Sequence, residues 1–189
     1  DHSSKARMLT VLLLLGSILF HQAYALDFDK SILEQVTQKF GKKATARLFY
    51  WKKIIESTKD DAPLKQLSVV NSFFNKVRFL SDKEHWQRDD YWATPLEMLA
   101  TNGGDCEDYS IAKYFTLREL GIPDEQLKIT YVKAIQINQA HMVLAYYPAP
   151  GDEPLILDNL VNDILPASQR TDLIPVYSFN GDGLWLSRL

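Results

Sequence analysis

The chain has 189 residues, of which 46% are hydrophobic and 12% aromatic, and its formal net charge is −3. This composition is typical of one compact globular domain and argues against disorder over most of the length. The lysines and arginines are scattered and form no basic stripe, which makes nucleic acid a poor partner.

Residues 1–25 have the three parts of a secretory signal peptide. Two basic residues precede an apolar run from Leu9 to Phe20, and Ala23-Tyr24-Ala25 follows it. The run is shorter than the ~20 residues that a membrane-spanning helix needs, so a permanent anchor is the weaker interpretation. We expect cleavage near Leu26, which would leave residues 26–189 as one exported domain.

The first half of this domain is predicted to be helical. Ser31 and Glu34 fit a capping box that opens a short helix ending near Gly41, and residues 44–56 continue with apolar residues at helical spacing. A third helix is predicted to open around Pro63, with one buried face whose apolar positions continue to Leu80.

A polar loop over residues 81–90 leads to a short helix and then to two glycines. Thr94 is the expected N-cap, and Glu97 completes a capping box with it. Gly103 and Gly104 are expected to let the backbone turn sharply before the next helix.

That next helix carries Cys106, the only cysteine of the chain. It is predicted to begin at Asp105 or Cys106, to end at Leu120 before Gly121, and to be central and largely buried. The free N–H groups and partial positive charge at its start favour a thiolate.

The acidic neighbours of this cysteine oppose that effect. Asp105, Glu107 and Asp108 should raise the pKa of the thiol, so the motif calls for a bound cation. They also disfavour burial of Cys106 in an apolar core, and an exported chain with one cysteine has no internal disulfide to form. We therefore interpret Cys106 as a reactive residue.

The second half of the chain is predicted to form strands. Residues 127–137, 141–147 and 155–160 are strand candidates, and residues 176–179 and 184–187 flank a four-residue hairpin connection. We predict an α+β fold in which N-terminal helices and a central helix bearing the nucleophile pack on an antiparallel sheet.

A cysteine nucleophile needs a base. Of the four histidines, His2 and His21 lie in the predicted signal peptide, and His85 lies in a charged loop where a solvated role is expected. His141 is the best candidate because it opens an apolar strand, so that its ring can point toward a neighbouring helix terminus.

The base in turn needs a group that orients it. Asp158 is the best candidate because an acid that ends an apolar strand is costly unless it is paired, and Asn159 is the alternative. Side-chain alternation lets only one of the two meet His141. A turn centred on residues 148–154 would place Asp158 opposite Leu144, so we predict an asymmetric loop, a bulge or a diagonal contact.

Together these segments resemble a known family. The resemblance depends on four segments: Gly103-Gly-Asp-Cys-Glu-Asp-Tyr-Ser110, His141-Met-Val-Leu144, Leu155-Ile-Leu-Asp-Asn159 and Asp90-Tyr-Trp-Ala-Thr-Pro95. They resemble the bacterial transglutaminase-like cysteine proteinases and, within them, the LapG-type periplasmic proteases. The resemblance spans essentially all of the mature chain and implies a papain-like or transglutaminase-like core.

The resemblance also implies the roles of the site residues. Cys106 would be the nucleophile, His141 the general base and acid, and Asp158 the orienting carboxylate. Asp105 and Glu107 match the family's Ca²⁺ site, which agrees with the preference of calcium for carboxylate oxygens. Asp108 is a further candidate ligand that could equally cap the helix.

The function implied by the resemblance is endoproteolysis in the periplasm. Family members cut a large cell-surface adhesin near its N-terminus, between small residues, which releases the adhesin and regulates biofilm attachment. An inner-membrane receptor that responds to cyclic di-GMP inhibits them. The mature enzyme would not insert into the membrane.

Two other functions stay open. A transglutaminase or amidase uses the same three residues, because an amine can intercept the acyl-enzyme in place of water. A non-catalytic, calcium-dependent periplasmic binding module would instead leave Cys106 unreactive.

Overall fold

The computed structural model describes residues 30–187, so the predicted signal peptide lies outside the described residues. Within residues 30–187, none of the helices combines the length and apolar character needed to span a bilayer.

The first half of the described chain is helical, as predicted. Its helices are α2 (Lys30–Phe40), α3 (Lys42–Thr58), α4 (Pro63–Phe74), α5 (Asp82–His85), α6 (Pro95–Thr101) and α7 (Cys106–Glu119). The helical spacing of α3 is confirmed, because its apolar residues at positions 48, 51, 54 and 55 are buried. The predicted capping box on α6 is confirmed: the Glu97 N–H donates to Thr94 Oγ1, and the Thr94 N–H donates to Glu97 Oε2.

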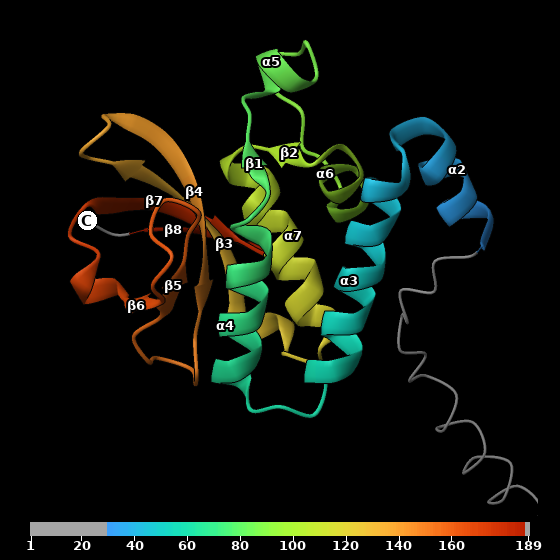
Figure 1. Ribbon diagram of the computed structural model, residues 1–189. Helices are drawn as coiled ribbons and strands as arrows, with labels where there is room; N and C mark the ends of the chain where they lie inside the picture. Colours follow the sequence, from blue (N-terminus) through green and yellow to red (C-terminus); the bar gives the residue numbers. More distant parts are fainter. Residues whose placement is uncertain (1–29, 188–189) are drawn as a thin grey trace, which may run out of the picture.

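Some features of the helical half differ from the prediction. Ser31 already lies within the first turn of α2. Helix α4 ends at Phe74, where the backbone of Asn75 caps it, so that the apolar residues up to Leu80 lie beyond the helix. The loop expected over residues 81–90 contains α5, whose N-cap is Ser81; α5 projects away from the body of the molecule (Figure 1).

The second half forms a six-stranded antiparallel sheet, which confirms the α+β prediction. Its strands, in spatial order, are β6 (Leu165–Pro166), β5 (Leu155–Leu157), β4 (Gln139–Tyr146), β3 (Leu127–Ala134), β7 (Leu173–Phe179) and β8 (Leu184–Leu186). Short 3₁₀ helices, η1 (Asp124–Gln126) and η2 (Ala167–Gln169), precede β3 and β7. The predicted hairpin connection joins β7 to β8, where Phe179 lies opposite Leu184.

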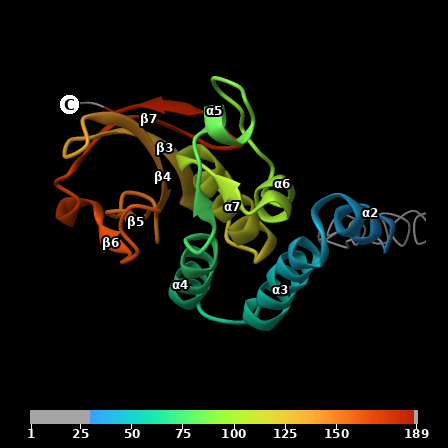
Figure 2. The same cartoon turned by 45° about the horizontal axis from the view of Figure 1, so that its top comes forward.

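Helix α7 lies at the centre of the molecule. It packs against β4 of the sheet and against α4 (Figures 1 and 2). Its last turn is held to α3 by a buried hydrogen bond from Trp51 Nε1 to Thr116 Oγ1, 2.9 Å long. This confirms the prediction of a central, largely buried helix, although Phe115 within it is exposed.

The two glycines before α7 have a different role from the one predicted. They form β2 (Gly103–Gly104), which pairs in parallel with β1 (Arg78–Phe79). The sharp turn lies one residue earlier, at Asn102, whose φ is 56°. A Cβ at Gly103 would lie 2.6 Å from Leu80 Cδ1, and one at Gly104 would lie 2.7 Å from Asp108 Oδ2. The glycines are therefore needed for close packing rather than for a turn.

Candidate active site

The thiol of Cys106 lies at the start of α7, beside the strand that carries His141. Cys106 is the first residue of the helix and is half-buried. Its sulfur accepts a hydrogen bond from the backbone N–H of Met142, the residue after His141 in β4. Its S–H donates to Glu107 Oε2 over 3.1 Å. The nucleophile is thus in contact with both the sheet and an acidic neighbour.

The surroundings of the thiol favour its protonated form. Burial raises the pKa of Cys106 above its ordinary value, and the negative charges of Glu107 and Asp105 raise it further, while the Met142 N–H acts in the opposite direction. The prediction that the flanking acids oppose thiolate formation is therefore confirmed.

His141 and Asp158 form a buried pair. His141 Nε2 and Asp158 Oδ1 are 2.7 Å apart, and the Leu160 N–H donates to the same oxygen over 3.1 Å. Burial alone would raise the pKa of Asp158, but its hydrogen bonds and charge contacts with His141 and Arg170 lower it to about 2. An ionised carboxylate only accepts, so Nε2 of His141 is the donor and Nδ1 is the nitrogen left free to receive a proton.

The strand register explains how these two residues meet. Leu157 lies opposite Leu144 in the β4–β5 pair, and β5 ends there. Continuing the same register by one residue places Asp158 opposite Val143, two residues from His141. The contact is therefore diagonal, as predicted, and not a direct cross-strand pair.

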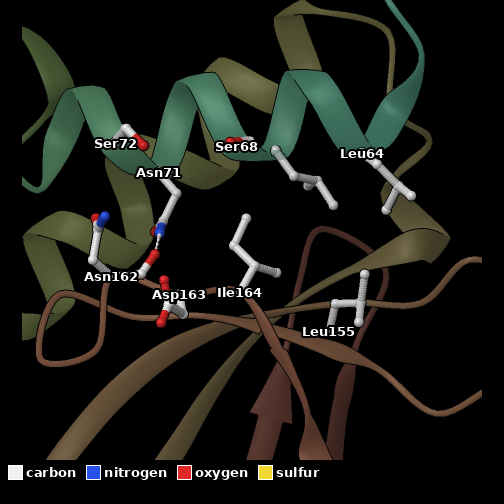
Figure 3. Close-up of a pocket in the computed structure, with 9 residues that line it drawn as sticks. Leu64, Ser68, Asn71, Ser72, Leu155, Asn162, Asp163 and Ile164 are labelled. Atoms are coloured by element: carbon white, nitrogen blue, oxygen red, sulfur yellow. Dashed lines mark hydrogen bonds between the residues drawn. The ribbon is translucent and has the colours of Figure 1, made fainter.

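Helix α4 fixes the segment that follows β5. Asn75 Nδ2 donates to the carbonyl oxygen of Asp158 over 2.8 Å, and Asn71 Nδ2 donates to that of Asn162 over 2.9 Å. Figure 3 shows the second bond at the edge of a cavity of about 380 Å³ between α4 and this segment. The cavity contains neither Cys106 nor His141 in its lining, so it lies apart from the candidate site.

Asn159, the alternative orienting residue, forms no hydrogen bond with His141 in the described part of the chain. Its Oδ1 is buried and has no hydrogen-bond partner among the described residues. Between Cys106 and His141, no hydrogen bond is formed in the described part of the chain; the thiol hydrogen is engaged by Glu107 instead.

A cluster of acidic residues surrounds the start of α7 and could hold a cation. Asp82, Asp90 and Glu107 can each place an oxygen within 4.8 Å of the others, and so can Asp82, Asp105 and Asp108. The Oδ1 atoms of Asp82 and Asp105 are buried without a hydrogen-bond partner in the described chain. Buried carboxylate oxygens without a donor fit a hard cation such as Ca²⁺.

Repulsion within the cluster supports the same interpretation. Burial raises the pKa of Asp105, and Glu107 and the other acids nearby raise it further. Burial likewise raises the pKa of Asp82, with the charges of Glu107 and Asp90 adding to the effect. A divalent cation would remove this repulsion.

Asp108 has a mainly structural role. Its Oδ1 accepts the Ala93 N–H over 2.7 Å, and its Oδ2 accepts the Asp105 N–H over 3.2 Å. One oxygen therefore caps the start of α7, which matches the capping role that the sequence left open, and the other holds the backbone just before α6.

Three residues of the site were not predicted from the sequence. Asp82 and Asp90 lie in the segment interpreted as a polar loop, and their spacing relative to Asp105 gave no signal. Arg170, which donates to Asp158, lies in a segment for which the sequence predicted neither a helix nor a strand. His85, expected to be solvated, is half-buried and forms a 2.8 Å hydrogen bond with Thr101 Oγ1.

Known proteins resemble this chain in sequence and in fold. Residues 44–179 match the family model described as bacterial transglutaminase-like cysteine proteinase (BTLCP). The structure of Legionella pneumophila LapG is 47% identical, with a TM-score of 0.75 over 83% of this chain and 87% of that one. Its calcium-bound form is 46% identical, with a TM-score of 0.76 over 84% and 88% of the two chains. The EGTA-treated form has the same identity and TM-score and covers 84% and 86%. No curated protein matches the chain.

Proposed function

The chain belongs to the bacterial transglutaminase-like cysteine proteinases, and we propose that it is a calcium-dependent periplasmic cysteine endopeptidase with Cys106, His141 and Asp158 as its catalytic residues. The observation that carries this proposal is the buried His141–Asp158 pair beside the thiol at the start of α7. The calcium-bound LapG structure supports the cation requirement.

The proposed reaction begins with transfer of the Cys106 proton to His141 Nδ1. The thiolate then attacks the scissile carbonyl, and the Cys106 backbone N–H at the start of α7 is the natural donor to the developing oxyanion. His141 returns its proton to the leaving amine as the acyl-enzyme forms. Water, deprotonated by the same imidazole, then hydrolyses the thioester and restores the thiol.

Asp158 acts throughout by holding the ring of His141. Its Oδ1 keeps the proton on Nε2, which leaves Nδ1 for the exchange with Cys106. This is why the orienting acid must be buried and ionised, and the low pKa of Asp158 satisfies that need.

The residues that would hold calcium are Asp105 and Glu107, with Asp82 and Asp90 from residues 81–90, the α5 segment. A bound Ca²⁺ would offset the negative charge beside the thiol and compete for the Glu107 carboxylate that now accepts the Cys106 S–H.

As substrate we propose the N-terminal region of a large cell-surface adhesin, whose cleavage would release it and so regulate biofilm attachment. An inner-membrane cyclic di-GMP receptor would be the inhibitor. The support is the similarity to LapG over more than four fifths of both chains, together with the predicted signal peptide for the periplasmic location.

The direct test is to incubate the protein with an adhesin N-terminal fragment, with and without Ca²⁺, beside Cys106→Ala. We expect cleavage by the unaltered protein with Ca²⁺ only, detected by mass spectrometry. Cleavage by Cys106→Ala, or undiminished cleavage in excess chelator, would contradict the proposal.

Two further readouts separate the alternatives. A primary amine added to the same reaction should leave a free carboxylate at the cut; amine incorporation instead would identify a transglutaminase. Cys106 should also react with iodoacetamide faster than free cysteine when Ca²⁺ is present. An equal or slower rate would favour a non-catalytic binding module.

A further inference from the structure

We propose that Arg170 is a positioning residue for the catalytic pair, held in place by Asp172, so that His141, Asp158, Arg170 and Asp172 act as one connected series of hydrogen bonds. This inference rests on the proposed function, because it assigns a role within the same reaction. Neither Arg170 nor Asp172 lies within the sequence motifs that indicated the site.

The two oxygens of Asp158 have separate partners. Oδ1 accepts from His141 and Leu160, whereas Oδ2 accepts from Arg170 Nη2 over 2.7 Å. Contacts on both oxygens fix the plane of the carboxylate and not only its position. Because the His141 hydrogen bond is directional, a fixed carboxylate plane also fixes the direction in which the imidazole points.

Arg170 is itself fixed by a two-point contact. Its Nε donates to Asp172 Oδ1 over 2.9 Å, and its Nη2 donates to Asp172 Oδ2 over 2.8 Å. The backbone carbonyl of Asp172 accepts the Ile135 N–H over 2.8 Å at the end of β3. The guanidinium is therefore tied to the sheet, and it contacts the Asp158 oxygen that His141 does not.

Charges alternate along the series of hydrogen bonds from Asp158 through Arg170 to Asp172. Arg170 is only 3% exposed, and Asp158 is 1% exposed. A carboxylate this deeply buried needs a cation to remain ionised, since neutral hydrogen bonds alone compensate only part of the cost of burial. Arginine suits the position because its planar fork can bind one carboxylate at two points while reaching a second.

The test uses three variants of the full chain. Arg170→Met removes the donor and the charge with little loss of volume, Arg170→Lys keeps the charge without the fork, and Asp172→Asn weakens the anchor alone. Arg118→Met is the matched control, because Arg118 pairs with Asp124 at the opposite end of α7 from Cys106. Thermal unfolding verifies that each variant is folded.

The first readout needs no substrate. Long-range ¹H–¹⁵N spectra report which ring nitrogen of His141 carries the proton. We expect the Nε2–H form in the unaltered protein and in Arg118→Met, and a mixture of the two forms in Arg170→Met. The Nε2–H form retained in a folded Arg170→Met variant would overturn the proposal, even if no peptide substrate were ever cleaved.

The second readout is kinetic. Loss of a charged hydrogen bond corresponds to about a 10- to 100-fold effect, and we expect it in kcat for Arg170→Met with KM little changed. Arg170→Lys should recover part of this loss, and Asp172→Asn should lose less than Arg170→Met. An equal fall in all variants, the Arg118 control included, would show a general loss of structure and overturn the assignment.

Discussion

At the scale of single residues, Asp158 illustrates how burial and bonding compete. Its carboxylate is removed from water, yet two cationic or donor side chains keep its pKa near 2. Because this folded-state pKa lies below the unfolded value of about 3.9, the contact stabilises the fold fully above pH ~3.9 and is lost as the pH falls toward 2.

Asp158→Asn is therefore expected to destabilise the protein in a pH-dependent way. At pH 7 the loss should reach about 3–5 kcal/mol, because Arg170 is left buried without its full partner. The difference in free energy of unfolding between this variant and the unaltered protein, measured by urea titration, should narrow from pH 4 to pH 2. A difference that widens over this range would contradict the pKa assignment.

Gly104 provides a second residue-scale prediction. A methyl group there would lie 2.7 Å from Asp108 Oδ2 and 2.9 Å from its Cβ. We expect Gly104→Ala to cost about 1–3 kcal/mol of stability through overpacking, and to lower the affinity for Ca²⁺ by shifting the start of α7.

The matched control is Gly183→Ala, whose new Cβ would meet nothing closer than Trp185 at 3.5 Å. Chemical denaturation should show a change within about 0.5 kcal/mol for this control. Equal losses from the two substitutions would rule out the packing argument for Gly104.

At the scale of elements, α7 begins with the reactive Cys106 and buries a lysine in its interior, which lowers the stability of the fold. Lys113 lies two turns beyond Cys106 and is 1% exposed. Burial lowers the pKa of its ammonium to about 7, although the nearby charge of Asp158 acts in the opposite direction. The ordinary value is about 10.4, so the folded state is destabilised most below pH 7, and this cost disappears as the pH rises toward 10.

Lys113→Met should therefore raise the melting temperature, and by more at pH 6 than at pH 9. For a domain of this size each kcal/mol corresponds to about 2–4 °C. Lys76→Met, at an exposed lysine, is the control and should change little. A lower melting temperature for Lys113→Met would mean that attraction to Asp158 outweighs the cost of burial.

Elements with local signals were predictable from the sequence, and those set by distant contacts were not. The boundaries of α6 and α7 follow from a capping box and from Gly121, which has a φ of 94°. Strands β1 and β2 have two residues each and exist only because they pair with one another across the intervening α5 and α6. No periodicity develops over two residues, so no pattern could indicate them.

The same reasoning applies to the site. Cys106 begins α7, Asp158 directly follows β5, and His141 is the first buried residue of β4, so each of them stands out against its neighbours in the sequence. Asp82 and Arg170 do not stand out, because aspartate and arginine are ordinary in polar segments. Their burial and contacts arise only when the fold brings those segments together.

At the scale of the whole molecule, the acidic cluster joins two parts of the helical half. Asp82 and Asp90 come from the α5 segment, which projects from the body in Figure 1, whereas Asp105 and Glu107 belong to the start of α7. A cation bound by both would hold the projecting segment against the site.

We expect Ca²⁺ to raise the melting temperature and to slow amide hydrogen exchange in residues 81–93, with less change in β3 and β4. The stabilisation should approach about 2.7 kcal/mol when free Ca²⁺ is 100 times the dissociation constant. Asp82→Asn should reduce both effects, whereas Asp152→Asn, in the exposed β4–β5 connection, should not. Protection that appears in the sheet and not in residues 81–93 would place the cation elsewhere.

The single cysteine has a consequence for how the protein is kept and handled. With one sulfur nucleophile, the chain has no wrong internal disulfide to form while it folds in the oxidising compartment that the proposed periplasmic location implies. Two molecules can still join through Cys106, and such a dimer would be inactive until a reductant separates it. The half-buried sulfur, covered by Glu107 and the Met142 backbone, slows that coupling, so aged preparations should regain activity on addition of a thiol.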